Sequence, residues 1–100
     1  MSTVTVAQVK DYLHLIHDSD DTRIQALINA AESYVLAFVR HDSLELDESD
    51  IDAPSVPDAV THAVKMIVEA RGYADPDTAQ TIMAAAEALL TPWIKGFACA

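Results

Sequence analysis

The 100-residue sequence has few of the residues that interrupt helices or form tight turns. It contains two Gly and four Pro, and it has no Asn-Gly or Asp-Gly pair, the strongest short signals of a β-hairpin. Seventeen residues are Ala, the best helix former. We therefore expect a chain that is mostly helical.

Other scarce features exclude whole classes of protein. Cys99 is the only cysteine, which excludes an intrachain disulfide and argues against a preorganised catalytic thiol. No apolar run approaches the roughly 20 residues that span a bilayer, and the N-terminus lacks the basic start of a secretion signal, so we expect a soluble, intracellular protein without a membrane partner. With six Lys and Arg against sixteen Asp and Glu, sequence-specific binding to duplex DNA is not expected.

Acidic charge is concentrated in one segment. Residues 41–58 hold seven acidic side chains and no Lys or Arg, and so account for seven of the ten net negative charges. A segment of this composition cannot fold on its own burial, and it is too long to be an incidental connection in a compact domain. The sequence therefore predicts a long acidic loop in the middle of the chain.

Four segments have helical starts and stops. Thr5 to Gln8 fits a capping box, and Asp20 or Asp21 suits the start of a second helix. Ser55 is the expected cap of a third helix, with Pro57 in its first turn and Gly72 at its end. Asp75-Pro76 predicts the start of a fourth helix, whose last turn Pro92 disturbs.

In each segment the apolar residues recur three and four positions apart, which predicts one buried face per helix. The residues expected on these faces are Val6, Val9, Tyr12 or Leu13 and Ile16; Ile24, Leu27, Ile28, Ala31, Tyr34 or Val35 and Phe38; Val60, Val64, Ile67 and Val68; and Ile82, Met83, Ala86, Leu89 and Leu90. The sequence thus predicts an all-α, four-helix domain that spans residues 1–100, with the acidic loop between its second and third helices.

Three stretches together resemble a known family. They are Val6-x-x-Val9-Lys10-x-Tyr12-Leu13, then Asp20-Asp21 followed by Ile24-x-x-Leu27-Ile28-x-Ala30-Ala31-Glu32-x-Tyr34-Val35, and finally Ala88-Leu89-Leu90-Thr91-Pro92-Trp93. In order and spacing they resemble the small head-tail connector, or portal-adjacent adaptor, proteins of tailed bacteriophages. The resemblance spans nearly the whole chain and is most specific over residues 20–35.

The resemblance implies a structural virion protein with no catalysis and no cofactor. Such a subunit would form a homo-oligomeric ring on the portal protein, extend the DNA channel, and support head completion and attachment of a tail or stopper protein. It would be assembled in the bacterial host cytoplasm, and DNA would pass through it without sequence-specific binding. The chain departs from the family pattern at Phe38-Val39-Arg40-His41, where a Gly-Arg pair is expected, and at Glu69-Ala70-Arg71-Gly72-Tyr73. These departures concern contacts made by loops.

Two sets of residues are candidates for function. The acidic residues Asp47, Glu48, Asp50 and Asp52 could line a channel, where negative charge would keep DNA from adhering, or they could form a solvated surface loop. Trp93, Ile94 and Phe97 could anchor the chain to the portal or to a neighbouring subunit, whereas Trp93 could equally cover the chain's own core.

His14-x-x-His17, with Asp18, Asp20 and Asp21 nearby, is not expected to bind a metal ion. The histidines lack helical i, i+4 spacing, no cysteine assists them, and the carboxylates lack the Gly-centred spacing of an EF-hand loop. Asp20 and Asp21 are better explained by the start of a helix.

Two other classes of protein remain as alternatives. Acyl carrier proteins are small, acidic and four-helical, and they attach phosphopantetheine to the serine of a triplet such as Asp42-Ser43-Leu44. That serine begins a helix in carrier proteins, whereas Ser43 precedes a stretch that reads as loop. An acidic mimic of DNA would fit the net charge but would spread it over a surface.

Overall fold

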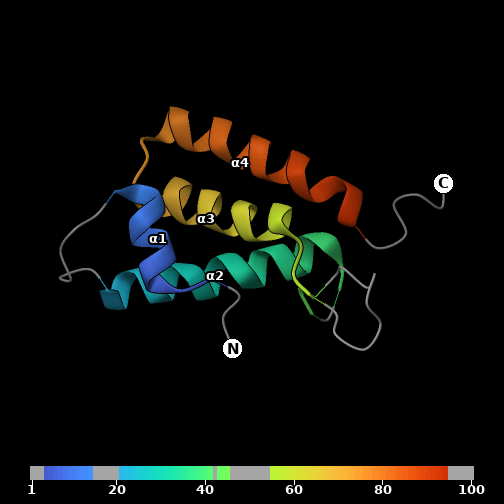
Figure 1. Cartoon of the computed structure of the whole chain (residues 1–100). Coiled ribbons are helices and arrows are strands. Elements are labelled where there is room, and N and C mark those ends of the chain that lie inside the picture. The colour runs from blue at the N-terminus through green and yellow to red at the C-terminus, as the bar shows by residue number, and fades with distance from the viewer. Residues whose placement is uncertain (1–3, 15–20, 42, 46–54, 95–100) are drawn as a thin grey trace.

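Four α-helices form most of the described chain, so the predicted all-α fold is confirmed. The computed structural model describes residues 4–14, 21–41, 43–45 and 55–94. The helices are α1 (Val6–Leu13), α2 (Asp21–Val39), α3 (Asp58–Gly72) and α4 (Pro76–Leu90), and the 3-10 turn η1 (Thr91–Trp93) follows α4. The central helix is α3, which lies between α2 and α4 and runs antiparallel to both, while α1 packs across α2 and α3 (Figure 1).

The predicted caps of α1 and α4 are confirmed. The Gln8 amide donates to Thr5 Oγ1 at 3.2 Å and the Thr5 amide donates to Gln8 Oε1 at 2.9 Å, which completes the capping box. At α4, Asp75 Oδ1 accepts from the Thr78 amide at 2.9 Å, and Pro76 occupies the first turn. Local sequence is therefore sufficient to place both helix starts.

The prediction that Ser55 caps the third helix is wrong. The N-cap is Pro57, whose carbonyl accepts from the Val60 and Thr61 amides at 3.0 and 3.1 Å. A cap at Ser55 would require Val56 to be helical, and a residue that precedes proline disfavours that conformation. The helix therefore begins at Asp58, while its predicted end at Gly72 is confirmed.

The core lies where α2 and α4 face α3 and is covered by α1. Its buried side chains are Val4, Val9, Ile24, Ile28, Ala31, Val35, Val39, Leu44, Val60, Ala63, Val64, Ile67, Val68, Ala86 and Leu90. Four of them, Val4, Val39, Leu44 and Ala63, were not among the predicted core residues. Val39 takes the fully buried position at the end of α2, and the predicted Phe38 is half-buried beside it. Of the other predicted core residues, Ile16 lies outside the described ranges.

The apolar residues of α4 form two faces, not the single face that the sequence predicts. Ala86 and Leu90 are fully buried, and Met83 packs against the core. Ile82 and Leu89 are half-buried and are not among the side chains that pack on this core. The reason is helical geometry, because Ile82 and Leu89 lie about 100° away from Met83 and Leu90 around the helix axis. A second apolar seam therefore remains on α4.

Candidate functional site

The interior of the described chain is almost entirely apolar, and its one buried polar atom without a hydrogen-bond partner is the Tyr73 hydroxyl oxygen. No polar or charged side chain among the described residues is fully buried. Acid–base catalysis depends on groups whose environments shift their pKa values, and a buried polar constellation of this kind is missing from the described part of the chain. Its polar contacts lie instead at the boundaries between helices.

One such contact joins α2 to α4 through Tyr34. Its hydroxyl donates a hydrogen bond to the Glu87 carboxylate, and the Arg71 guanidinium lies 5.5 Å from the centre of its ring. Phe38 stacks against the same ring at 6.2 Å. The hydrogen bond to Glu87, together with burial and the negative charge of Glu87, raises the pKa of Tyr34, and Arg71 opposes the shift. Tyr34 therefore stays protonated and serves as a structural link.

An open groove of about 380 Å³ lies next to this link, between α3 and α4. Its lining residues are Ala70, Arg71, Ala79, Gln80, Met83, Ala84 and Glu87. Arg71 and Glu87 are the charged residues of this lining, and the others are uncharged. Nothing in the sequence indicated this groove, because its lining residues come from two helices and belong to no motif.

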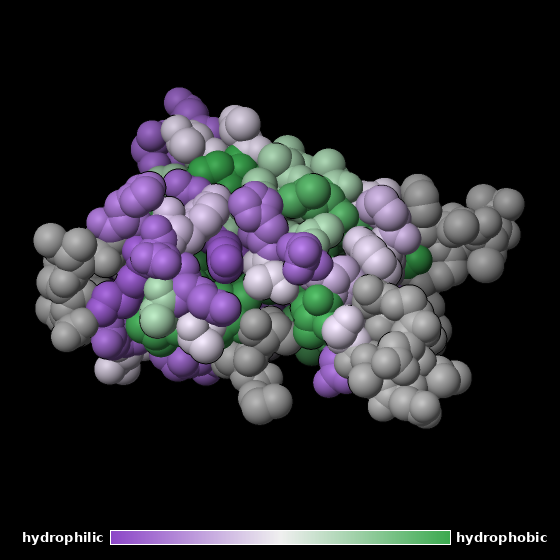
Figure 2. Space-filling model, viewed as in Figure 1, coloured by the Kyte–Doolittle hydropathy of each residue, from purple (hydrophilic) through white to green (hydrophobic). Residues whose placement is uncertain are grey.

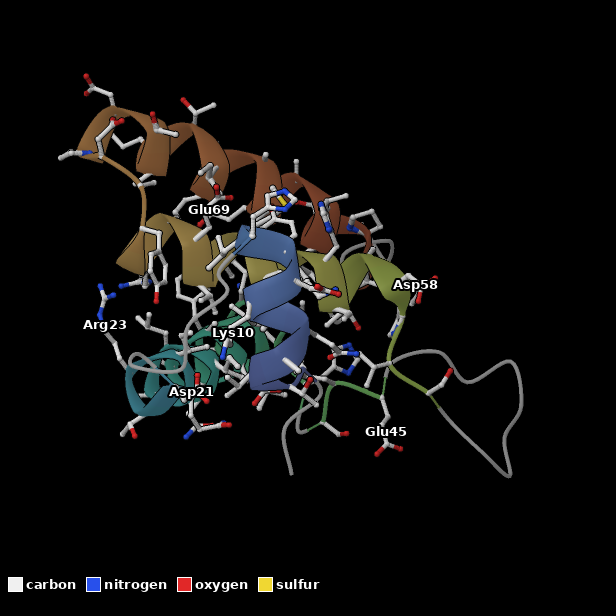
Figure 3. All side chains as sticks on the ribbon, turned by 60° about the vertical axis from the view of Figure 1, so that its left-hand side comes forward. Lys10, Asp21, Arg23, Glu45, Asp58 and Glu69 are labelled. Atoms are coloured by element: carbon white, nitrogen blue, oxygen red, sulfur yellow. The ribbon has the colours of Figure 1, made fainter. Side chains whose placement is uncertain are left out.

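A second set of contacts fixes α1 to the other helices (Figure 3). Lys10 Nζ lies 3.1 Å from Asp21 Oδ1 at the start of α2, and the Tyr12 hydroxyl donates to Glu69 Oε1 on α3 at 3.3 Å. Burial, followed by the charge of and the hydrogen bond to Glu69, raises the pKa of Tyr12. The rings of His62 and Tyr12 are nearly perpendicular, with their centres 5.7 Å apart. These contacts hold a short helix that has little burial of its own.

The described residues form a small helical domain whose polar contacts join neighbouring helices. The chain matches the family described as phage gp6-like head-tail connector protein over residues 3–85. The chain belongs to this family. No curated protein and no solved structure gives a significant match.

Membership in the connector family indicates the broad role of the protein. Head-tail connectors are structural phage proteins, so this connector is a virion component and not an enzyme, and its family implies contact with portal and tail proteins. No described helix is long and apolar enough to cross a membrane.

The candidate residues at the end of the connector chain separate into three cases. Trp93 is half-buried and packs against the core, and His41 Nε2 lies 3.1 Å from its backbone oxygen. Ile94 is half-buried but does not belong to that core contact set. Phe97 lies outside the described residues. Trp93 thus packs on this chain's own core, and Ile94 does not.

The acidic candidates Asp47, Glu48, Asp50 and Asp52 lie outside the described residues, as does most of the predicted acidic loop. Its described ends are nevertheless informative. Leu44 is only 5% exposed and belongs to the core, although the sequence suggested a solvated loop at this position. The acidic stretch is therefore attached to the helical body on its N-terminal side.

The described residues of the connector do not have the geometry expected for a metal site or for a carrier protein. His14 is exposed and ends α1 in the left-handed conformation at φ 60°, Asp21 pairs with Lys10, and the described ranges contain no group of three metal ligands. His17, Asp18 and Asp20 lie outside those ranges. Ser43 begins no helix, and its Oγ accepts a hydrogen bond from the Glu45 amide at 3.2 Å. A carrier serine at a helix start is not what this geometry provides.

Proposed function

We propose that the chain is the subunit of a homo-oligomeric ring that docks on the portal protein and extends the DNA channel. In this role it supports head completion and the attachment of a tail or stopper protein. The observation that carries the proposal is the connector-family match over residues 3–85 of a chain whose described part contains four helices. Assembly takes place in the host cytoplasm.

Electrostatics support a channel that does not retain DNA. The net charge is −10, and the acidic stretch carries most of it. Protein–DNA affinity depends on Lys and Arg that neutralise phosphates, so a lumen lined by Asp47, Glu48, Asp50 and Asp52 would repel the passing duplex. DNA then moves through the ring without sequence-specific binding.

The end of the chain supports contact with a partner. Ile94 and Phe97 follow η1 and are apolar, and Ile94 is half-buried without packing on the described core. Together with the edge of Trp93 they provide an anchor for the portal or for a neighbouring subunit.

Native mass spectrometry of the purified protein, alone and mixed with a portal ring, tests the proposal. A cyclic oligomer, or stoichiometric loading of the portal, is the expected result. A monomer that neither assembles nor loads the portal would refute the proposal, and a mass increase of one phosphopantetheine on coexpression with a transferase would favour the carrier alternative at Ser43.

A further inference from the structure

The second apolar seam of α4 consists of partly exposed apolar side chains that do not pack on the chain's own core. Ile82, Ala85 and Leu89 recur at intervals of three and four residues, so they form a continuous stripe along the helix. Figure 2 shows apolar surface gathered over α4, whereas the surface over α1 is mainly hydrophilic. Two half-buried large aliphatic side chains in one stripe are typical of a helix that packs against a further element.

The opposite edge of the molecule has a matching shape. The exposed side of α2 is uncharged and small over most of its length, with Ala26, Ala30, Ser33 and Ala37 in one row. In Figures 1 and 3 this helix and α4 lie on opposite sides of α3. Large side chains from one helix insert best between small side chains of another, because the backbones then approach closely. The large side chains on α4 therefore have a shape that fits the spaces between the small side chains on α2.

The lack of acidic groups on both faces favours a second copy of this chain as the partner that packs on them. Two molecules of net charge −10 repel each other unless the faces that meet lack acidic groups. The stripe on α4 and the row on α2 are such faces. The two helices run parallel (Figure 1), so when they are aligned at their first residues, Arg23 of one copy lies level with Thr78 of the next, one residue from Asp77. In the same register Ile82 lies level with the space between Ala26 and Ala30, and Leu89 with the space between Ser33 and Ala37.

We infer that the stripe Ile82, Ala85 and Leu89 on α4 of one copy packs on the row Ala26, Ala30, Ser33 and Ala37 on α2 of the next copy. The two surfaces differ and lie on opposite edges, so the contact is heterologous, and repetition of such a contact closes a ring when the rotation per subunit permits. The inference rests on the proposed ring and names the two helix faces that build it.

Cross-linking in a Cys99→Ser background tests this contact, because Cys99 is the chain's only cysteine. The double variant Ala30→Cys/Ala85→Cys, treated with a short bismaleimide under conditions of ring assembly or portal loading, should give a covalent ladder beyond the dimer. Each single variant should stay uncross-linked. The control pair Ala7→Cys/Ala85→Cys, which moves one cysteine to the exposed side of α1, should give no ladder.

The outcomes separate the contact from the proposed function. Dimers from Ala85→Cys alone would show a symmetric α4–α4 contact, and cross-links from position 85 to portal or tail protein would assign the seam to that partner; either result overturns the inference. If the Cys99→Ser parent forms an oligomer in native mass spectrometry but the double variant gives no ladder, the proposed interface is wrong and the proposed ring is retained. If the parent assembles neither alone nor on the portal, both the proposed function and the proposed interface are refuted.

A charge placed on the α2 row gives an independent test. Ala30→Glu should weaken assembly by about tenfold or more, because it sets a carboxylate against an apolar stripe of an acidic molecule. Ala7→Glu adds the same charge on α1 and should assemble normally. Circular dichroism should show equal helix content in both variants, and equal assembly of the two would contradict the inference.

Discussion

The Tyr34 hydroxyl donates a hydrogen bond to the Glu87 carboxylate, and this contact joins α2 to α4 across the helix that separates them. The acceptor is charged, and a hydrogen bond to a charged group contributes more to stability than a neutral one. Arg71 on α3 lies over the same ring, so one aromatic side chain contacts all three long helices. The link holds the two edges of the molecule at a fixed separation.

Replacement of Tyr34 by Phe should lower the free energy of unfolding by about 1 kcal/mol at neutral pH, since it removes one hydrogen bond to a half-exposed carboxylate. The same variant should change the response to alkali. The pKa of Tyr34 in the folded chain is raised above its ordinary value of 10.0, so its contribution is fully present below pH 10 and is lost as the pH rises through the folded pKa.

Urea unfolding between pH 8 and pH 11 measures this effect. The stability of the parent should fall more steeply above pH 10 than that of Tyr34→Phe. Tyr12→Phe should reduce the alkaline loss as well, because the pKa of Tyr12 is also raised. Parallel stability curves for the parent and Tyr34→Phe would contradict the predicted linkage.

Local signals were sufficient to predict most of the fold. A capping box at Thr5, the Asp75-Pro76 pair and the period of three and four residues in α2 each depend on a few neighbouring residues, and each is present in the structure. The start of α3 was misplaced because the restriction on Val56, which precedes proline, outweighs the capping tendency of Ser55. Helix type was thus easier to predict than one helix boundary.

The candidate site was harder to predict because it depends on packing between distant segments. The sequence assigns Ile82 and Leu89 to the same face as Leu90, since a window of apolar residues does not show how wide the buried side of a helix is. Leu44 was missed because acidic neighbours dominate its segment. The position of Trp93 depends on His41 and the core, and no motif connects them. Family resemblance supplied the function, which no single residue indicates.

Substitution of Arg40 by Gly should stabilise the protein by about 0.5–1 kcal/mol. Arg40 follows α2 at φ 63°, where the left-handed conformation costs an L-residue roughly 1–2 kcal/mol, and the greater flexibility of unfolded Gly offsets part of that gain. The backbone contacts to the Leu36 carbonyl that end the helix remain available to Gly. Thermal unfolding measures the difference. Arg40→Ala removes the same charge but keeps Cβ, so it should show no gain, and equal stability of the two variants would refute the argument.

Leu44 should be important for stability although it lies at the edge of the acidic stretch. Its side chain is 5% exposed, so Leu44→Ala should cost about 2–3 kcal/mol through lost burial and the cavity left behind. The neighbouring Glu45 is exposed, and Glu45→Ala should stay within about 0.5 kcal/mol of the parent. The urea midpoints of the two variants provide the comparison. A neutral Leu44→Ala would mean that this segment is not attached to the core.

Trp93 and Phe97 should have separable effects. Trp93→Ala should lower the free energy of unfolding by about 2 kcal/mol, less than for a fully buried tryptophan, because the side chain is half-buried on the core. Phe97→Ala should leave thermal unfolding unchanged and reduce portal loading or ring assembly, as measured by native mass spectrometry. If both variants assemble normally, residues 93–97 do not take part in the proposed contact.

Neutralisation of the acidic stretch tests the proposed channel lining. The variant with Asp47→Asn, Glu48→Gln, Asp50→Asn and Asp52→Asn should slow DNA ejection, or leave DNA in the particles, because repulsion between the lumen and the duplex is reduced. The measurement is the rate of triggered ejection together with the amount of nuclease-protected DNA. The control variant Asp11→Asn/Asp58→Asn removes exposed charge from α1 and from the start of α3, and its particles should eject DNA normally.

The effect should depend on salt. The difference in ejection rate between the parent and the loop variant should shrink as the salt concentration rises, because the Debye length falls to about 3 Å at 1 M. Assembly and ejection unchanged at low salt would place these carboxylates on the outer surface of the ring.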